Sequence, residues 1–122
     1  MKKLLLVDDE ESVVVGMRRY FRACGFAVDT AEERAAAEAL LTQQAYDAIV
    51  VDLGLTAGQG PDGLEVVLLA RQVCPAARIV VLTAFGSAEV EAEARRRGAD
   101  VFLQKPRPLP DVRSAIEAPA ES

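Results

Sequence analysis

The chain has 122 residues, of which 51% are hydrophobic, 27% charged and 5% aromatic, and this size and composition predict one globular domain. Nineteen Asp and Glu against fourteen Lys and Arg give a net charge of −5, which argues against binding to a nucleic-acid backbone or an anionic membrane surface. The lack of histidine excludes a Ser-His-Asp hydrolase, a His-ligated zinc site and a phosphohistidine formed on this chain.

The cysteines and the start of the chain bear on the cellular compartment. Cys24 and Cys74 are far apart and show no Cys-x-x-Cys spacing, so we expect small buried side chains rather than a redox pair or zinc site. The apolar run after Met1-Lys2-Lys3 is too short for a signal peptide, and no later run is long enough to cross a membrane. We therefore expect a cytoplasmic protein with reduced cysteines.

Five short apolar runs predict five β-strands. Four of the runs are unbroken rather than alternating, which is typical of strands buried on both faces of a parallel sheet, and the second is weaker. In chain order the runs are Leu4–Val7, Phe26–Val28, Ala48–Val51, Ile79–Leu82 and Val101–Leu103.

Segments with helical character separate these runs. Ala31–Gln44 is rich in Ala and Glu and predicts a helix, and Gly25 and Gly98 lie where helices are expected to end. Apolar residues at helical spacing predict three more helices that pack on the sheet. They are Val14, Met17, Phe21 and Cys24 in the first, Leu64, Val67 and Leu68 in the second, and Leu109, Val112 and Ile116 in the last.

The segment Ser87–Arg97 is the most polar of the predicted helices. Two ion pairs at i, i+4 spacing, each worth about 0.3–0.5 kcal/mol, favour a helix there. They are Glu91 with Arg95 and Glu93 with Arg97. We interpret this segment as a solvated face, with a docking surface as the alternative.

The order of strand and helix, repeated five times, requires crossover connections. It predicts an α/β fold, a doubly wound five-stranded parallel sheet with helices on both faces. Because Pro119 ends the last helix, we expect residues 1–118 to form the domain and residues 119–122 a C-terminal tail or the start of a linker.

Polar residues follow four of the predicted strands, at the sheet edge where ligands bind in such folds. They are Asp8 and Asp9, Asp52, Thr83 and Lys105. Two carboxylates about 4 Å apart repel by about 4 kcal/mol at an effective dielectric near 20, and one lysine does not neutralise three carboxylates. Oxygen ligands with this excess charge predict a Mg²⁺ site. Taken singly, each residue has a simpler explanation, such as a helix cap for Asp8 or Asp9, and only the ordered spacing is specific.

These segments resemble the receiver domain of the two-component response-regulator family, from Lys2 to Ile116. The matching segments run from Leu4 to Glu10, Ile49 to Asp52, Val80 to Ala84 and Gly98 to Pro106. The resemblance implies a flavodoxin-like (βα)5 fold in a phosphorylation-dependent signalling domain. Such a domain is not an enzyme, but it assists its own phosphorylation and dephosphorylation.

The resemblance also implies a role for each site residue. Asp52 would accept the phosphoryl group, and Mg²⁺ would be held by Asp8, Asp9, Asp52 and the carbonyl of Gly54. Thr83 and Lys105 would bind phosphoryl oxygens. Thr83 and Phe102 would form the switch, and the bond before Pro106 would be cis.

The implied partners are proteins. A histidine kinase or histidine phosphotransfer protein would be the donor, which fits a chain without histidine. A downstream protein or effector domain would bind the fourth helix, fifth strand and fifth helix, and a homodimer is a further possibility. Neither nucleic acid nor membrane is an expected partner.

The chain departs from the family pattern in one loop, and other functions compete. The segment Leu53–Gly63 is three residues longer than usual, and the last helix is shorter. The alternative is a degenerate receiver-like module for protein interaction or dimerisation, not controlled by phosphorylation. An aspartate-nucleophile phosphatase or mutase would carry Asp-x-Asp after its first strand, and a dinucleotide-binding enzyme would carry Gly-x-Gly-x-x-Gly; neither motif is present there.

Overall fold

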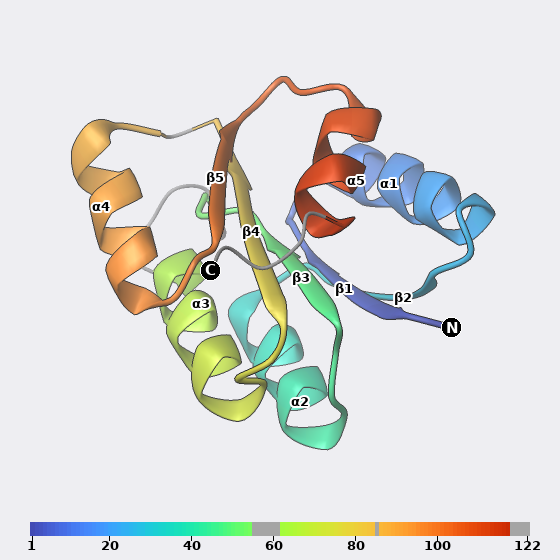
Figure 1. Ribbon diagram of the computed structural model, residues 1–122, viewed down its shortest axis with the longest axis horizontal. Coiled ribbons are helices and arrows are strands. Elements are labelled where there is room, and N and C mark those ends of the chain that lie inside the picture. The colour runs from blue at the N-terminus through green and yellow to red at the C-terminus, as the bar shows by residue number, and fades with distance from the viewer. Residues whose placement is uncertain (55–61, 85, 118–122) are drawn as a thin grey trace.

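The computed structural model describes residues 1–54, 62–84 and 86–117. It contains a five-stranded sheet in the order β2-β1-β3-β4-β5 with every neighbouring pair parallel, which confirms the predicted fold (Figure 1). The elements are β1 (Lys3–Val7), α1 (Glu11–Ala23), β2 (Ala27–Ala31), α2 (Arg34–Gln43), β3 (Ala48–Val51), α3 (Asp62–Val73), β4 (Arg78–Thr83), α4 (Ala88–Arg97), β5 (Val101–Gln104) and α5 (Leu109–Glu117).

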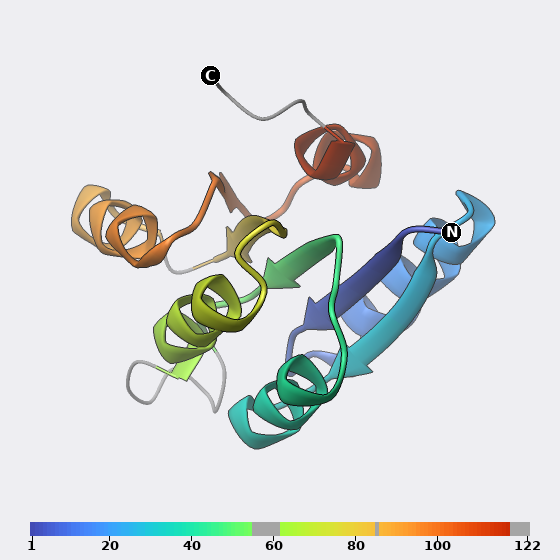
Figure 2. The same ribbon diagram turned by 60° about the horizontal axis from the view of Figure 1, so that its bottom comes forward.

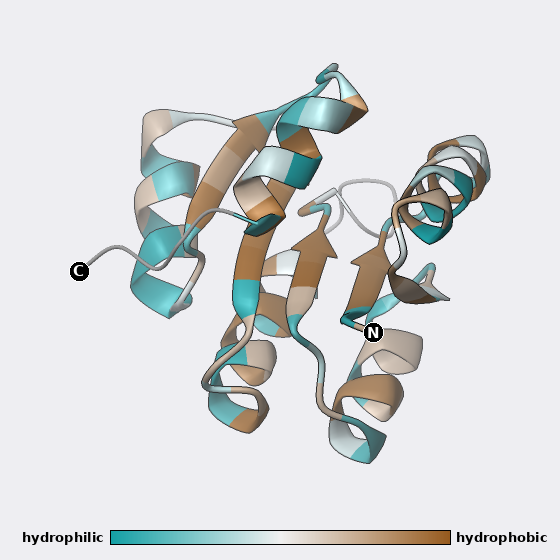
Figure 3. Cartoon of the chain, turned by 45° about the vertical axis from the view of Figure 1, so that its right-hand side comes forward, coloured by the Kyte–Doolittle hydropathy of each residue, from teal (hydrophilic) through white to brown (hydrophobic). Residues whose placement is uncertain are grey.

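The helices cover both faces of the sheet, with α1 and α5 on one face and α2, α3 and α4 on the other (Figure 2). Successive strand residues point to opposite faces, so Ile49 packs towards α2–α4 while Val50 packs towards α1 and α5. Both faces are therefore apolar, and the central strands are hydrophobic along their length (Figure 3). This is why the sequence runs are unbroken rather than alternating.

The boundary between β2 and α2 differs from the prediction. The strand expected at Phe26–Val28 extends over Ala27–Ala31, and the helix expected from Ala31 begins at Arg34. β2 is an edge strand, and its polar residues Asp29 and Thr30 are only half-buried. The apolar run therefore ends before the strand does.

The buried face of α3 also differs from the prediction. Leu64 and Leu68 are only half-buried, and the face in the core is made by Gly63, Val66, Val67 and Ala70. In the other two predicted stripes Val14, Met17 and Phe21 of α1 and Val112 and Ile116 of α5 are buried, whereas Cys24 and Leu109 are only half-buried. Both cysteines are unpaired, with Cys74 buried and Cys24 half-buried.

Helix α4 has the polar character that its sequence predicts. Of its described residues Ala94 alone is buried, and both predicted ion pairs form, Arg95 with Glu91 at 3.0 Å and Arg97 with Glu93 at 2.7 Å. Gly98 ends this helix at φ 122°, a conformation that disfavours residues with a Cβ, and Gly25 follows α1 at φ 96°.

The carboxyl ends of the strands lie at one edge of the sheet, and backbone hydrogen bonds extend the ladder beyond the strand ends. The amides of Asp8, Asp52 and Lys105 donate to the carbonyls of Ala31, Val7 and Thr83 at 3.1, 2.8 and 2.9 Å respectively. The strand order reverses between β1 and β3, so this edge holds the usual ligand position of such folds.

Two predictions concern segments outside the described residues. They are the greater length of the loop across residues 55–61 and the C-terminal tail at 119–122. Within the ranges 1–54, 62–84 and 86–117, no helix is both long enough and apolar enough to span a bilayer.

Candidate functional site

Three carboxylates meet at the carboxyl edge of the sheet. Asp8 and Asp9 follow β1, Asp52 follows β3, and one carboxylate oxygen from each lies within 4.8 Å of the others. Asp8 and Asp52 are buried, with relative exposures of 6% and 5%, whereas Asp9 is exposed. The structure therefore brings together the three acids that the sequence placed at one site.

Lys105 is the cation that faces these acids. Its Nζ lies 2.6 Å from Asp8 Oδ2 and 3.2 Å from Asp52 Oδ2, so one ammonium bridges the two buried carboxylates. A single positive charge leaves the group with excess negative charge, as its residue types predict.

Backbone amides orient the buried carboxylates. The Gly54 amide donates to Asp52 Oδ1 at 3.0 Å, and the Glu10 amide donates to Asp8 Oδ1 at 2.9 Å. The N-cap residue of α1 is Glu10 rather than Asp8 or Asp9, so the helix-cap explanation of these aspartates is wrong. Gly54 is buried, and its amide contacts Asp52. The expected role of its carbonyl as a metal ligand stays a prediction.

Burial and charge shift the pKa of two groups in the site. Burial raises the pKa of Asp8, and the negative charge of Asp52 adds to this, against the opposing hydrogen bond from Lys105. Burial alone would lower the pKa of Lys105, but the hydrogen bond to Asp8 and the charge on Asp52 outweigh it and raise that pKa. The lysine is thus held charged, while ionised Asp8 is disfavoured.

The donor set fits a hard divalent cation. Its side-chain ligand atoms are carboxylate oxygens, and a second positive charge would relieve the repulsion that disfavours ionised Asp8. Magnesium prefers such oxygen ligands.

Glu10 is a site residue that the sequence argument left without a role. Its Oε1 lies 3.6 Å from Lys105 Nζ, and its side chain is 60% exposed. The signal was its position directly after the acidic pair.

Gly63 is a second residue to which the sequence argument gave no role. Its lack of a side chain allows α3 to approach the segment that follows β3. A Cβ at this position would lie 2.4 Å from the Leu53 Cα and 2.8 Å from the carbonyl oxygen of Asp52. Both are backbone atoms, so a side chain here would displace the chain around Asp52.

The predicted switch residues lie on β4 and β5. Thr83 is fully buried at the end of β4, and Phe102 is half-buried on β5, where it packs on the α2–α4 face and pairs in register with Val81. Thr83 accepts the amide of Lys105 through its carbonyl. The Lys105–Pro106 peptide bond is cis.

Comparison with known proteins identifies the family. The family model described as "Response regulator receiver domain" matches residues 4–117. The chain belongs to this family. It is a receiver domain, a signalling domain of response regulators, as the sequence resemblance implies.

Curated relatives are longer proteins that contain a similar segment. The photosynthetic apparatus regulatory protein RegA of Rhodobacter capsulatus is 36% identical over 121 residues, which is 99% of this chain but 64% of RegA. The alginate biosynthesis transcriptional regulatory protein AlgB of Pseudomonas aeruginosa is 38% identical over 109 residues, 85% of this chain and 22% of AlgB. The receiver domain thus spans less than two thirds of these relatives.

Solved structures share the fold. A response regulator from Burkholderia pseudomallei, crystallised with a phosphorylated aspartic acid, calcium ion and citrate, superposes with a TM-score of 0.89 at 30% identity over 97% of this chain and 68% of that one. A CheY-like receiver domain from Methanospirillum hungatei gives 0.88 at 22% identity over 95% of this chain and 90% of that one, which supports the fold alone.

Proposed function

We propose that Asp52 accepts a phosphoryl group from a phosphohistidine of a partner protein. A carboxylate oxygen of Asp52 bonds to phosphorus as the bond between phosphorus and the histidine nitrogen breaks, which leaves an acyl phosphate and a free imidazole. The position of Asp52 carries the proposal, since this carboxylate is buried and shares the Lys105 ammonium with Asp8 at the edge where strand order reverses. The related Burkholderia protein carries a phosphorylated aspartic acid.

The residues present fit a bound Mg²⁺, which the carboxylates of Asp8, Asp9 and Asp52 and the Gly54 carbonyl would hold. When bound, the ion neutralises charge on the phosphoryl oxygens and on the acids. The calcium ion of the Burkholderia structure supports a divalent cation in this family.

The chain's own residues orient the group and respond to it. Lys105, already held charged beside Asp52, neutralises a phosphoryl oxygen, and the Gly54 amide keeps the Asp52 carboxylate in place during the transfer. The phosphoryl group attracts the Thr83 hydroxyl, and the Phe102 ring moves into the space that Thr83 leaves. This movement changes the surface formed by α4, β5 and α5. To shift the population, the phosphoryl group must stabilise the active conformation over the resting one by about 3–5 kcal/mol. A few charge-assisted hydrogen bonds can supply this difference.

A groove beside the site supports a protein donor. It has a volume of about 530 Å³ and lies between α1 and the start of α5, with Lys105 and Glu10 in its lining. Its apolar lining includes Val13, Met17 and Leu109, so the histidine-bearing segment of a histidine kinase or phosphotransfer protein could dock there.

The remaining partner assignments extend from the family. A downstream protein or effector domain binds the α4–β5–α5 surface, and residues 1–118 form the unit that carries the switch. The domain assists both gain and loss of its own phosphoryl group, and two unpaired cysteines favour the reducing cytoplasm.

Incubation with acetyl phosphate and Mg²⁺ tests the proposal. The intact protein should gain one phosphoryl group by mass spectrometry, and EDTA or Asp52→Asn should abolish the gain. Asp47→Asn is the matched control. Asp47 directly precedes β3, whereas Asp52 directly follows it, so this substitution should leave labelling unchanged. Labelling that persists in Asp52→Asn contradicts the assignment, and an unlabelled wild-type protein favours the degenerate module.

A further inference from the structure

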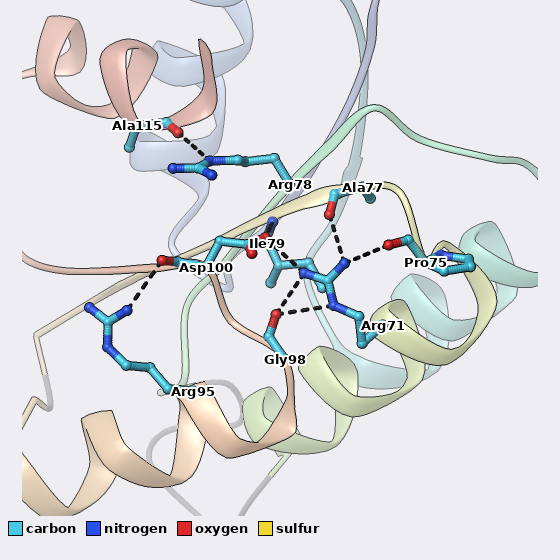
Figure 4. Close-up of polar contacts among 9 residues, drawn as sticks. All are labelled: Arg71, Pro75, Ala77, Arg78, Ile79, Arg95, Gly98, Asp100 and Ala115. Atoms are coloured by element: carbon cyan, nitrogen blue, oxygen red, sulfur yellow. Dashed lines mark hydrogen bonds and ion pairs between the residues drawn. The ribbon is translucent and has the colours of Figure 1, made fainter. Parts of the chain in front are cut away.

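The C-terminal end of α4 is tied to α3 by one arginine. Arg71 of α3 donates from Nε and an amino group to the carbonyl of Gly98 at 3.2 and 2.7 Å, and it pairs with Asp100 Oδ2 at 2.7 Å (Figure 4). The same guanidinium donates to the carbonyls of Pro75 and Ala77 before β4. Arg71 therefore joins three segments: the end of α3, the connection between α3 and β4, and the turn after α4.

The turn after α4 is further fixed by its own contacts. Asp100 Oδ2 also accepts the Ile79 amide at 2.8 Å, which ties the turn to β4. A Cβ on Gly98 would lie 2.7 Å from the Arg71 side chain, so the two are already in close contact. The geometry of this turn depends on a glycine at positive φ and an arginine packed against it.

A second tie to α3 comes from Arg97, the last residue of α4. Arg97 pairs with Glu65 of α3 at 3.0 Å and with Glu93 of its own helix at 2.7 Å. These side chains are 23–34% exposed, so water screens their charges only in part.

The N-terminal end of α4 is held differently. Among the described residues, 86–91 form side-chain hydrogen bonds and ion pairs only within α4 and its cap, where Ser87 Oγ accepts the Val90 amide at 3.1 Å. Gly86 lies against the side chain of Gln104, which is exposed on β5 and pairs in register with Thr83. Val90 packs half-buried on the core, but the described part of this end has no polar side-chain tie to α3, and it is the end of α4 that follows β4 and Thr83.

We propose that Arg71, supported by the Glu65–Arg97 pair, is a pivot for α4: it fixes the C-terminal end, so that α4 responds to the site by moving its N-terminal end. The anchor is a property of the resting protein, whereas the movement rests on the function proposed above. Arg71 is a positioning residue, since it acts through Gly98 and Asp100.

Hydrogen exchange of the resting protein tests the anchor without any ligand. The amides of Gly98, Ala99 and Asp100 all have backbone acceptors, and they should exchange at least about tenfold more slowly than those of Val90 and Glu91. Arg71→Met keeps the aliphatic packing and should accelerate the first group about tenfold while leaving the second within about twofold. Equal protection of both ends, or no effect of Arg71→Met, overturns the anchor.

Arg78→Met is the matched control. Arg78 is also half-buried and donates to a backbone carbonyl, that of Ala115 at 2.9 Å, but on α5 rather than α4 (Figure 4). Its loss should leave residues 94–100 unchanged. If Arg71→Met does not fold, Asp100→Asn and Glu65→Gln each weaken one tie and should each accelerate exchange at Gly98 by about threefold or more.

Addition of Mg²⁺ and beryllofluoride, a phosphoryl mimic, tests the pivot. In the wild-type protein, exchange should change at Val90 and Glu91 by about threefold or more and stay within about twofold at Gly98–Asp100; in Arg71→Met both ends should change. A wild-type response that is equal at both ends overturns the pivot. If the resting difference is present but no amide responds, including those near Asp52, the proposed function fails and the movement with it, while the anchor stands.

Discussion

At the carboxyl edge of the sheet, Asp8, Asp52 and Glu10 share one lysine, whereas at the contact between α3 and α4 Asp100 and Glu65 each have an arginine. The first group is largely buried and negative in sum, while the second is partly exposed and balanced. Charge without enough counter-charge destabilises a fold, so it marks a place that a ligand completes. Balanced charge at an interface needs no ligand and serves to position helices.

Removal of the lysine should have the largest effect on this comparison. Lys105→Met leaves two buried carboxylates without their shared partner, so it should lower the free energy of unfolding of the metal-free protein by about 1–3 kcal/mol at neutral pH. It also removes the cation that competes with a metal, so Mg²⁺ should restore more stability than in the wild type. Thermal unfolding with and without Mg²⁺ measures both, and an equal response to Mg²⁺ in the two proteins would count against a shared site.

Removal of the Asp8 carboxylate should have a smaller effect and should stabilise the protein rather than destabilise it. Because burial raises the pKa of Asp8, its ionisation costs stability; this cost is absent below the ordinary aspartate pKa and appears as the pH rises through the folded-state pKa. In EDTA, Asp8→Asn should therefore match the wild type near about pH 4 and exceed its Tm by a few degrees near about pH 8.

Differential scanning calorimetry over that pH range measures the difference in Tm between the two proteins. Because both proteins share their other titratable groups, the effects of those groups cancel in this difference. Asp47→Asn serves as the control, since Asp47 is exposed at the opposite end of β3. A gain for Asp8→Asn that grows towards low pH would contradict the sign.

The smallest effect is expected within α4. Glu91→Gln removes an ion pair with Arg95 whose two side chains are 42% and 47% exposed, so it should cost about 0.3–0.5 kcal/mol and less in high salt. Urea unfolding at two salt concentrations measures it. A loss above about 1 kcal/mol would show that exposed pairs in α4 bear more of the stability than the comparison allows.

The positions of Asp8, Asp52 and Lys105 were predictable because each directly follows a strand. Asp8, Asp52 and Lys105 continue the ladder by one residue, so once the apolar runs give the strands, parallel pairing brings their ends together. The match of the pattern to a known family supplied the roles of these residues.

Other features depend on contacts that local patterns do not contain. The buried face of α3 is set by Gly63 against Leu53, and the ties of Arg71 reach residues that are close only in the folded chain. The edge strand β2 was shortened in the prediction because Asp29 and Thr30 are polar at a half-covered edge. An arginine in a helix sequence gives no sign of which carbonyl it will meet.

The ladder hydrogen bonds at the ends of β1, β3 and β5 provide built-in reporters for NMR. The amides of Asp8, Asp52 and Lys105 each have a fixed carbonyl acceptor, so their resonances should stay sharp in the resting domain. Each amide belongs to a residue whose side chain meets the others in the site. Their chemical shifts would therefore follow the arrival of a cation and of a phosphoryl group separately, on the unmodified protein.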